Sequence, residues 1–124
     1  MSEPLHGVVV CHGELAQALV GAVEEISGIR GALTAVSNAG RDRNALEEQV
    51  LEAVVGRPGL VFVDLPSGSC LFAAMRRLGG LDSVRVVTGV NLAMLLEFVF
   101  HRDADVEVAR ARAIEAGSRA IGGR

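Results

Sequence analysis

The stretch VVVCHGEL, residues 8–15, joins an apolar run to the start of a helical pattern. The run reaches back to Leu5, and its unbroken valines are typical of a parallel strand that is buried on both faces. From Glu14 to Ser27 the apolar residues recur at helical spacing, and Gly28 supplies a stop. The junction therefore predicts a central strand over residues 5–11 that turns into a helix at His12. The expected inward face of that helix is Leu15, Ala18, Leu19, Ala22, Val23 and Ile26.

The same alternation continues along the chain. We expect further strands at residues 32–37, 60–63 and 84–88 and helices at about 44–55, 71–78, 92–100 and 105–116. Asn44 with Glu47 is a variant of the capping box, and glycines end the third helix (Gly79-Gly80) and the last (Gly117). The faces that we expect to be buried are Leu71, Ala74, Met75 and Leu78 on the third helix and Leu92, Leu95, Leu96, Val99 and Phe100 on the fourth.

This order predicts an α/β fold with three layers: a doubly wound, mostly parallel sheet of about four strands with helices on both faces. Residues 118–124 are a tail or an antiparallel C-terminal edge strand. Half of the 124 residues are apolar, so the chain fits a single domain, residues 1–124, with a sizeable core.

Composition excludes several classes of function. A net charge of -3 without charge blocks, and an aromatic content of 3%, argue against nucleic-acid binding. All 12 basic residues are arginine, which excludes a P-loop or Schiff-base lysine. No apolar run approaches the roughly 20 residues of a membrane span and no signal segment is recognisable, so we expect a cytoplasmic protein. Cys11 and Cys70 lack the spacing of a structural zinc site or a disulfide framework, and we expect neither metal nor cofactor.

Polar residues follow three of the predicted strands. They are His12 and Gly13 after the first, Asp64 with the segment 67–69 after the third, and Asn91 after the fourth. The carboxyl ends of parallel strands meet at one edge of a sheet, and ligands bind there. Each segment also leads into a helix whose first amides and dipole favour an anion. This edge therefore predicts a site for a phosphate or a phosphorylated side chain.

His12 fits the role of a nucleophile at that edge. A neutral imidazole attacks phosphorus through one ring nitrogen while the other donates a hydrogen bond, and Asp64 would fix that tautomer and stabilise the cation-like product. Hydroxyls and turn amides would hold the phosphoryl oxygens. A histidine at a strand end is more often a capping or solvated residue, so the prediction depends on its coincidence with Asp64. We expect His12 and Asp64 to be catalytic and Gly13, Ser67, Gly68, Ser69 and Asn91 to bind the phosphoryl group.

Other chemistries fit less well. Cys11 and His12 are adjacent on a strand, so their side chains point to opposite faces and form no dyad. The segment PSGSC, residues 66–70, is not the G-x-S-x-G elbow of a serine hydrolase. A receiver-type regulator needs acidic residues after its first strand to bind Mg²⁺, and Cys11-His12 occupies that place. His6 and His101 lie away from the carboxyl edge and look structural.

Three segments resemble motifs of the enzyme IIA domain of the mannose-type (mannose/fructose/sorbose) sugar phosphotransferase system. Residues 9–16, VVCHGELA, are similar to the family's apolar strand, S/T-H-G and helix. DLPSGSC, residues 64–70, resembles its D-x-x-G-G-S-P, and GVNLAMLLE, residues 89–97, resembles its G-V-N-L-P-M-L-x-E. The spacing of these segments covers essentially the whole chain.

The resemblance implies a doubly wound homodimer with a C-terminal edge strand that can be exchanged between subunits. It implies that His12 accepts a phosphoryl group from the phosphocarrier protein HPr and passes it to an enzyme IIB (EIIB) component, with Asp64 orienting the histidine and Ser69 near the phosphoryl group. Peripheral association with a membrane permease also follows. The alternative is a regulatory or interaction module with the same fold and no transport role.

The chain departs from the family motifs at Ser67, Cys70, Phe72 and Ala93, where Gly, Pro, Asn and Pro are usual. A positive φ at Ser67 would be costly for a non-glycine residue. We therefore expect the loop over residues 67–70 to differ from the family's, while His12 and Asp64 are intact.

Overall fold

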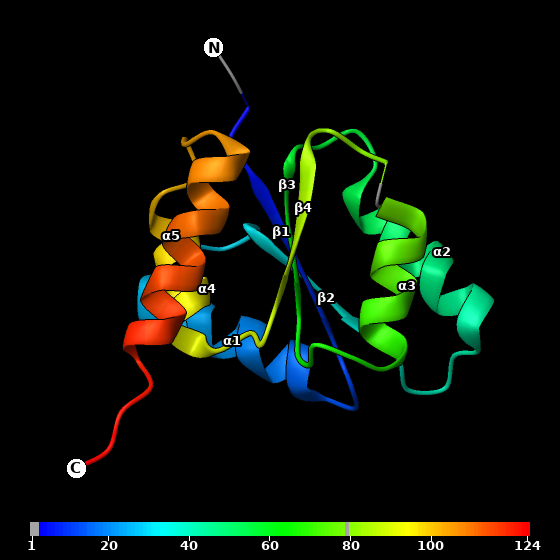
Figure 1. Ribbon diagram of the computed structural model, residues 1–124, viewed down its shortest axis with the longest axis horizontal. Helices are drawn as coiled ribbons and strands as arrows, with labels where there is room; N and C mark the ends of the chain where they lie inside the picture. Colours follow the sequence, from blue (N-terminus) through cyan, green and yellow to red (C-terminus); the bar gives the residue numbers. More distant parts are fainter. Residues whose placement is uncertain (1–2, 79) are drawn as a thin grey trace.

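The computed structural model describes residues 3–78 and 80–124. Four parallel strands form its sheet in the order β2-β1-β3-β4 (Figure 1). They are β1 (His6–Cys11), β2 (Leu33–Ser37), β3 (Gly59–Val63) and β4 (Val84–Thr88). Within the described ranges residues 120–124 form no strand, so the optional antiparallel edge strand is not part of this sheet.

Helices cover both faces of the sheet, as predicted. The described residues form α1 (Leu15–Ser27), α2 (Arg43–Val54), α3 (Ser69–Leu78), α4 (Leu92–Phe100) and α5 (Val106–Arg119). In Figure 1, α1, α4 and α5 lie on one side of the sheet and α2 and α3 on the other. Each side has its own apolar cluster, and together they confirm the three-layer, doubly wound arrangement. None of these helices is long and apolar enough to cross a bilayer.

The central strand is β1, and its register fixes where the polar strand ends meet. All six of its residues are buried, as the valine run predicted. Val10 pairs with Val63 of β3, and Cys11 pairs with Ser37 of β2. The chain therefore runs outward from β1 to β2 and then returns to β3 on the opposite side of β1. This reversal makes the carboxyl ends of β1 and β3 the switch point of the sheet, where such folds bind ligands.

His6 holds the opposite end of the sheet together, as its predicted structural role requires. The Arg57 guanidinium can only donate, and it lies 3.3 Å from Nδ1 of His6, so Nε2 carries the ring proton and donates to Thr34 Oγ1 at 2.7 Å. Burial, with the charges of Arg57 and Arg102, lowers the pKa of His6 to about 4. The ring is therefore neutral near pH 7. His101 is also structural, since its Nδ1 donates to the Glu97 carbonyl at 3.0 Å.

Two predicted helix ends are wrong. The N-cap of α2 is Asp42, whose side chain accepts from the Ala45 amide at 2.8 Å, so Asn44 is not the cap. Helix α5 continues through Gly117 to Arg119. Gly117 is buried inside the helix, and the absence of a side chain there makes room for Met94, since a Cβ would lie 2.8 Å from Met94 Cε. Gly79, predicted to end the third helix with Gly80, lies outside the described residues.

The buried faces of three helices also differ from prediction. Helix α1 turns Ala16 and Val23 inward and leaves Leu15 and Ile26 exposed. Its apolar residues lie on two overlapping stripes, and the stripe through Ala16 and Val23 packs against the sheet. Met75 of α3 and Phe100 of α4 are half exposed, and their places in the core are taken by Ala73 and by Phe98. Phe98 packs edge to face on Phe62 of β3, with ring centroids 5.3 Å apart.

We predict that Gly59→Ala is strongly destabilising and Gly21→Ala is not. A Cβ at Gly59 would lie 1.8 Å from the His6 carbonyl oxygen, so β1 and β3 would have to separate. A Cβ at Gly21, inside α1, meets nothing within 4 Å. We expect Gly59→Ala to lower the free energy of unfolding by about 3 kcal/mol or more and Gly21→Ala to raise it by roughly 0.5–1 kcal/mol. Urea denaturation of the two variants measures both, and equal stabilities would contradict the close approach.

Candidate functional site

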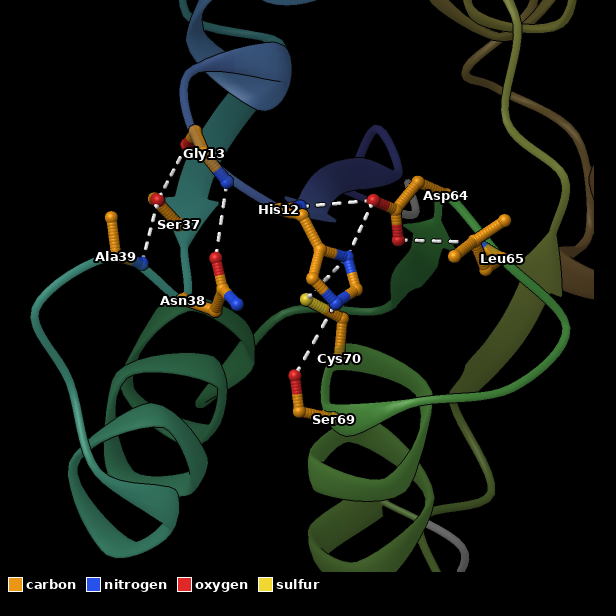
Figure 2. Close-up of polar contacts among 9 residues, drawn as sticks. All are labelled: His12, Gly13, Ser37, Asn38, Ala39, Asp64, Leu65, Ser69 and Cys70. Carbon is orange, nitrogen blue, oxygen red and sulfur yellow. Dashed lines mark hydrogen bonds and ion pairs between the residues drawn. The ribbon is translucent and has the colours of Figure 1, made fainter.

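The candidate site lies at the switch point, where β1 delivers His12 and β3 delivers Asp64. One carboxylate oxygen of Asp64, Oδ2, accepts from the backbone N–H of His12 at 2.9 Å and lies 2.8 Å from Nδ1 of its ring (Figure 2). The other oxygen accepts from the Leu65 amide at 3.0 Å. The structure thus brings together the two residues predicted to be catalytic, which are 52 positions apart in the chain.

Asp64 is ionised and sets the tautomer of the His12 ring. Its burial opposes ionisation, but the hydrogen bonds from the His12 backbone and ring outweigh burial and lower the pKa of the carboxyl. A carboxylate only accepts hydrogen bonds, so a neutral His12 ring carries its proton on Nδ1 and has its lone pair on Nε2. The His12 side chain is 41% exposed, against 10% for Asp64. The nitrogen lone pair therefore lies on His12, the more exposed of these two side chains.

Ser69 and Gly68 lie on the Nε2 side of the ring. The Ser69 hydroxyl is 3.4 Å from His12 Nε2 and belongs to the first residue of α3. Gly68 lies against the imidazole, since a Cβ on it would be 3.8 Å from His12 Cε1. Its φ is +94°, a conformation that favours glycine. The helix start supplies backbone amides that have no partner within the helix, so this side of the ring suits an anion.

Ser67 does not have the strained backbone that its replacement of glycine suggested. No non-glycine residue among those described has a positive φ, and the left-handed position in this loop is Gly68. Ser67 is exposed. The loop therefore accommodates this departure from the family motif without backbone strain.

Gly13 and Asn91 use their polar groups within the fold. Gly13 donates its N–H to Asn38 Oδ1 at 3.0 Å, and its carbonyl accepts from the Ser37 hydroxyl at 2.6 Å. The Asn91 side chain caps α4 by accepting from the Met94 amide and donates to the Gly117 carbonyl, both at 3.0 Å. The contacts that the structure gives these two residues do not involve His12, and their place in the phosphoryl-binding group stays a prediction.

Cys70 is a site residue that the sequence reasoning missed. Its Sγ lies 3.7 Å from His12 Nδ1, on the same nitrogen that faces Asp64 (Figure 2). The side chain is buried, and burial together with the Asp64 charge raises the pKa of the thiol to about 11. Cys11, which stands next to His12 in the sequence, packs in the core cluster on the α1 side of the sheet, as expected. The sequence did contain one indication of this role: Cys70 ends the loop that begins at the predicted catalytic residue Asp64.

A cavity of about 260 Å³ borders this cluster at Ser69. It lies between the start of α2 and the start of α3, and the Arg43 guanidinium stacks over the Phe72 ring at its rim, 4.9 Å from the centroid. The cavity therefore presents positive charge and an aromatic face beside the residues that surround Nε2. Its lining consists of Asn38, Arg41, Asp42, Arg43, Leu46, Ser69 and Phe72.

Comparison with protein families matches residues 7–114 to one family, described as PTS system fructose IIA component. The match begins at the second residue of β1 and runs through α4 and most of α5, and it therefore includes every residue of the cluster around His12. Comparison with curated protein sequences found no match.

Several solved structures share the fold. The chain is similar to the phosphotransferase system component EIIA from Streptococcus agalactiae, with a TM-score of 0.89, 22% sequence identity and 96% of each chain covered. It is also similar to the mannose/sorbose specific IIA subunit from Enterococcus faecalis, with a TM-score of 0.85 and 22% identity over 98% of this chain and 96% of that one. A PTS IIA protein associated with the fucose utilization operon of Streptococcus pneumoniae gives 0.83 and 20% identity, with 99% and 96% covered.

We predict that Asp64→Ala moves the ring proton of His12 from Nδ1 to Nε2. Without the carboxylate, the Cys70 thiol can donate to Nδ1 and the Ser69 hydroxyl can accept from Nε2–H, so the other tautomer gains partners. Long-range ¹H–¹⁵N spectra of the imidazole, recorded at a pH where the ring is neutral, distinguish the tautomers.

Asp64→Asn is the matched control for this prediction. It keeps an acceptor oxygen at the same place, so the Nδ1–H tautomer should persist. Thermal unfolding of both variants establishes that they are folded. An unchanged tautomer in folded Asp64→Ala would show that the carboxylate does not set it.

Proposed function

The chain belongs to the family of PTS system fructose IIA components, and from that premise we propose that it is a phosphoryl carrier whose phosphorylated atom is Nε2 of His12. The observation that carries the proposal is the 2.8 Å contact between Asp64 Oδ2 and His12 Nδ1, which leaves the lone pair on Nε2. Membership of this family makes the protein a component of a phosphotransferase system. The residues and partners of the transfer belong to our proposal.

In the proposed step, Nε2 attacks the phosphorus of a donor phosphohistidine from the side opposite the donor nitrogen. The new Nε2–P bond forms as the donor P–N bond breaks, and the bonding pair returns to the donor imidazole. Nδ1 keeps its proton throughout, so the His12 ring gains positive character and the Asp64 carboxylate stabilises it. Transfer between two histidines is close to neutral in energy, and the site's task is to position the groups and neutralise charge.

Ser69 and the start of α3 are the proposed binding groups for the phosphoryl oxygens. The Ser69 hydroxyl, 3.4 Å from Nε2, is close enough to donate to an oxygen of a phosphoryl group carried on that nitrogen. The helix dipole and the first amides of α3 favour the added negative charge. The Arg43 side of the neighbouring cavity adds a positive rim along which an anionic donor can approach.

We propose HPr as the phosphoryl donor and an EIIB component as the acceptor, in the cytoplasm, with the output either sugar uptake or its regulation. Both partners would use the same exposed Nε2, because the opposite nitrogen is occupied by Asp64. The second candidate is a regulatory module in which phosphorylation of His12 is itself the signal. Transfer to EIIB distinguishes the phosphoryl carrier from the regulatory module, since only the carrier passes its phosphoryl group on to EIIB.

We predict that the protein gains one acid-labile phosphoryl group when incubated with phosphoenolpyruvate, enzyme I and HPr. Intact-mass spectrometry at alkaline pH measures the gain. His12→Gln should remove it, because the amide nitrogen of glutamine has its lone pair delocalised into the carbonyl and does not attack phosphorus. Ser69→Ala should slow it by about 10–1,000-fold if the hydroxyl stabilises the transferred group.

The matched control is His101→Gln, which changes a histidine whose ring contacts Glu97 and should be labelled like the wild type. An absence of label on the folded wild-type protein, with HPr phosphorylated in the same tube, would refute the carrier proposal. Label that persists in His12→Gln would assign the phosphoryl group to another residue.

We also propose that the protein is a homodimer in which the segment 120–124 adds to β4 of the partner. In the described sheet β4 lies at an edge, where unpaired strand groups invite another strand. The segment extends away from the body in Figure 1, and Ile121 is 78% exposed. The extended tail of one subunit, with its exposed apolar side chain, could therefore pair with the open edge strand of the other subunit.

Light scattering coupled to gel filtration should give about twice the 12.9 kDa chain mass for the wild type and the monomer mass for a chain that ends at Arg119. Thermal unfolding shows that the shortened chain is folded. A wild-type mass of one chain would refute the dimer, and a dimer that persists after shortening would place its interface elsewhere.

A further inference from the structure

Three potential metal ligands of different chemistry converge on one side of His12. They are Nδ1 of His12, a carboxylate oxygen of Asp64 and Sγ of Cys70, and these atoms all lie within 4.8 Å of one another. The cluster is the one group of this kind found among residues 3–78 and 80–124. Cys70 replaces the proline of the family motif, so the third donor comes from one of this chain's departures from its relatives.

The separations of these atoms are close to those that a tetrahedral zinc ion requires. Bond lengths of about 2.0 Å to nitrogen and oxygen and 2.3 Å to sulfur place the N and O ligands roughly 3.3 Å apart and the N and S ligands roughly 3.5 Å apart. The observed distances are 2.8 Å from Nδ1 to the Asp64 oxygen and 3.7 Å from Nδ1 to Cys70 Sγ. These two separations need adjustments of about 0.5 Å or less. The Asp64 oxygen and Cys70 Sγ lie within 4.8 Å and must come to roughly 3.5 Å, which requires the Cys70 or Asp64 side chain to rotate as the ion binds.

The donor set also selects the ion. One imidazole, one carboxylate and one thiol suit Zn²⁺, whereas Mg²⁺ and Ca²⁺ prefer oxygen ligands. Two anionic ligands, the Asp64 carboxylate and a Cys70 thiolate, balance the charge of a dication. In the described part of the chain the ion-pair partner of Asp64 is His12, so no arginine competes with a metal for the carboxylate.

We propose that His12 Nδ1, Asp64 Oδ2 and Cys70 Sγ bind one Zn²⁺ ion, and that zinc and phosphoryl transfer exclude one another at His12. The zinc ion takes the lone pair of Nδ1, so the ring proton moves to Nε2, and the Cys70 thiol gives its proton to solvent. A protonated Nε2 has no lone pair with which to attack phosphorus. A solvent molecule would supply the fourth ligand of a tetrahedral ion.

The binding half of this proposal stands on the three ligands alone, while the inhibition half rests on the proposed carrier function. Phosphorylation should in turn weaken zinc binding, because a phosphoryl group on Nε2 requires the Nδ1 proton for its hydrogen bond to Asp64. Zinc binding at Nδ1 and phosphorylation at Nε2 thus compete because each requires the ring proton at a different place. The zinc ion and the phosphoryl group need not overlap in space.

Isothermal titration of the untagged protein with Zn²⁺ tests the binding half. The wild type should bind one ion per chain, and Cys70→Ser should bind at least about 10–100-fold more weakly, since loss of even an outer-shell partner has an effect of that size. Cys11→Ala is the matched control: it removes the other buried cysteine, which packs in the core on the opposite side of the sheet, and should bind like the wild type. His101→Gln should also bind like the wild type, which excludes the surface pair with Glu97.

Co²⁺ gives an independent readout that does not require a folded variant. Cobalt bound to the wild type should show a thiolate-to-cobalt charge-transfer band and the intense visible bands of tetrahedral geometry. A wild-type spectrum without the charge-transfer band, no binding of Zn²⁺, or equal affinities of wild type and folded Cys70→Ser would each overturn the site.

The inhibition half is tested by labelling with phosphoenolpyruvate, enzyme I and HPr with and without Zn²⁺, and by taking the ratio of the two rates for each protein. The rate with Zn²⁺ divided by the rate without it should be about 0.1 or less for the wild type and near one for Cys70→Ser. Cys70→Ser also controls for any effect of zinc on the donor proteins. Equal ratios would overturn the exclusion. A wild-type protein that takes no label even without zinc would instead count against the carrier function, and the zinc titration would still decide the metal site.

Discussion

The hydrogen bonds from His12 to Asp64 are the interaction on which the site depends. One carboxylate oxygen accepts both the backbone N–H and the ring Nδ1–H of His12, at 2.9 and 2.8 Å, and so fixes the position and the tautomer of the imidazole together. That geometry exists because Val10 and Val63 are paired partners in neighbouring strands. The pairing brings Asp64, one residue beyond Val63, within hydrogen-bond distance of His12, two residues beyond Val10. A shift of one residue in the register would turn Asp64 to the other face of the sheet and leave the imidazole without its acceptor.

The register in turn depends on close backbone approach at the far end of the same two strands. Gly59 begins β3 opposite His6, where no Cβ fits, and the neutral His6 ring ties β1 to Thr34 of β2. Both ends of β1 are thus held by specific polar contacts, while its middle is buried valine. A strand fixed in this way gives a rigid platform, which suits a site whose task is to position one nitrogen.

Cys70 shows how a single departure from a family motif changes what a site can do. The residue lies behind the imidazole, on the nitrogen that does not carry the phosphoryl group in our proposal, so it leaves the Nε2 side unaltered. It adds a thiol to a histidine and a carboxylate that are already in contact. In our two proposals, the same hydrogen-bonded pair activates Nε2 for phosphoryl transfer and supplies two of the three protein ligands of the zinc ion.

The sequence by itself determined the order of elements, the central place of the valine-rich strand and the meeting of His12 with Asp64. These follow from local rules, because the period of apolar residues identifies strands and helices, and the carboxyl ends of parallel strands share one edge. The tertiary structure alone decided which stripe of α1 faces the sheet, that Gly117 lies inside α5 against Met94, and that Cys70 reaches Nδ1 of His12. Each of these depends on how side chains distant in sequence fill space together, and the spacing of residues along one segment carries no information about that packing.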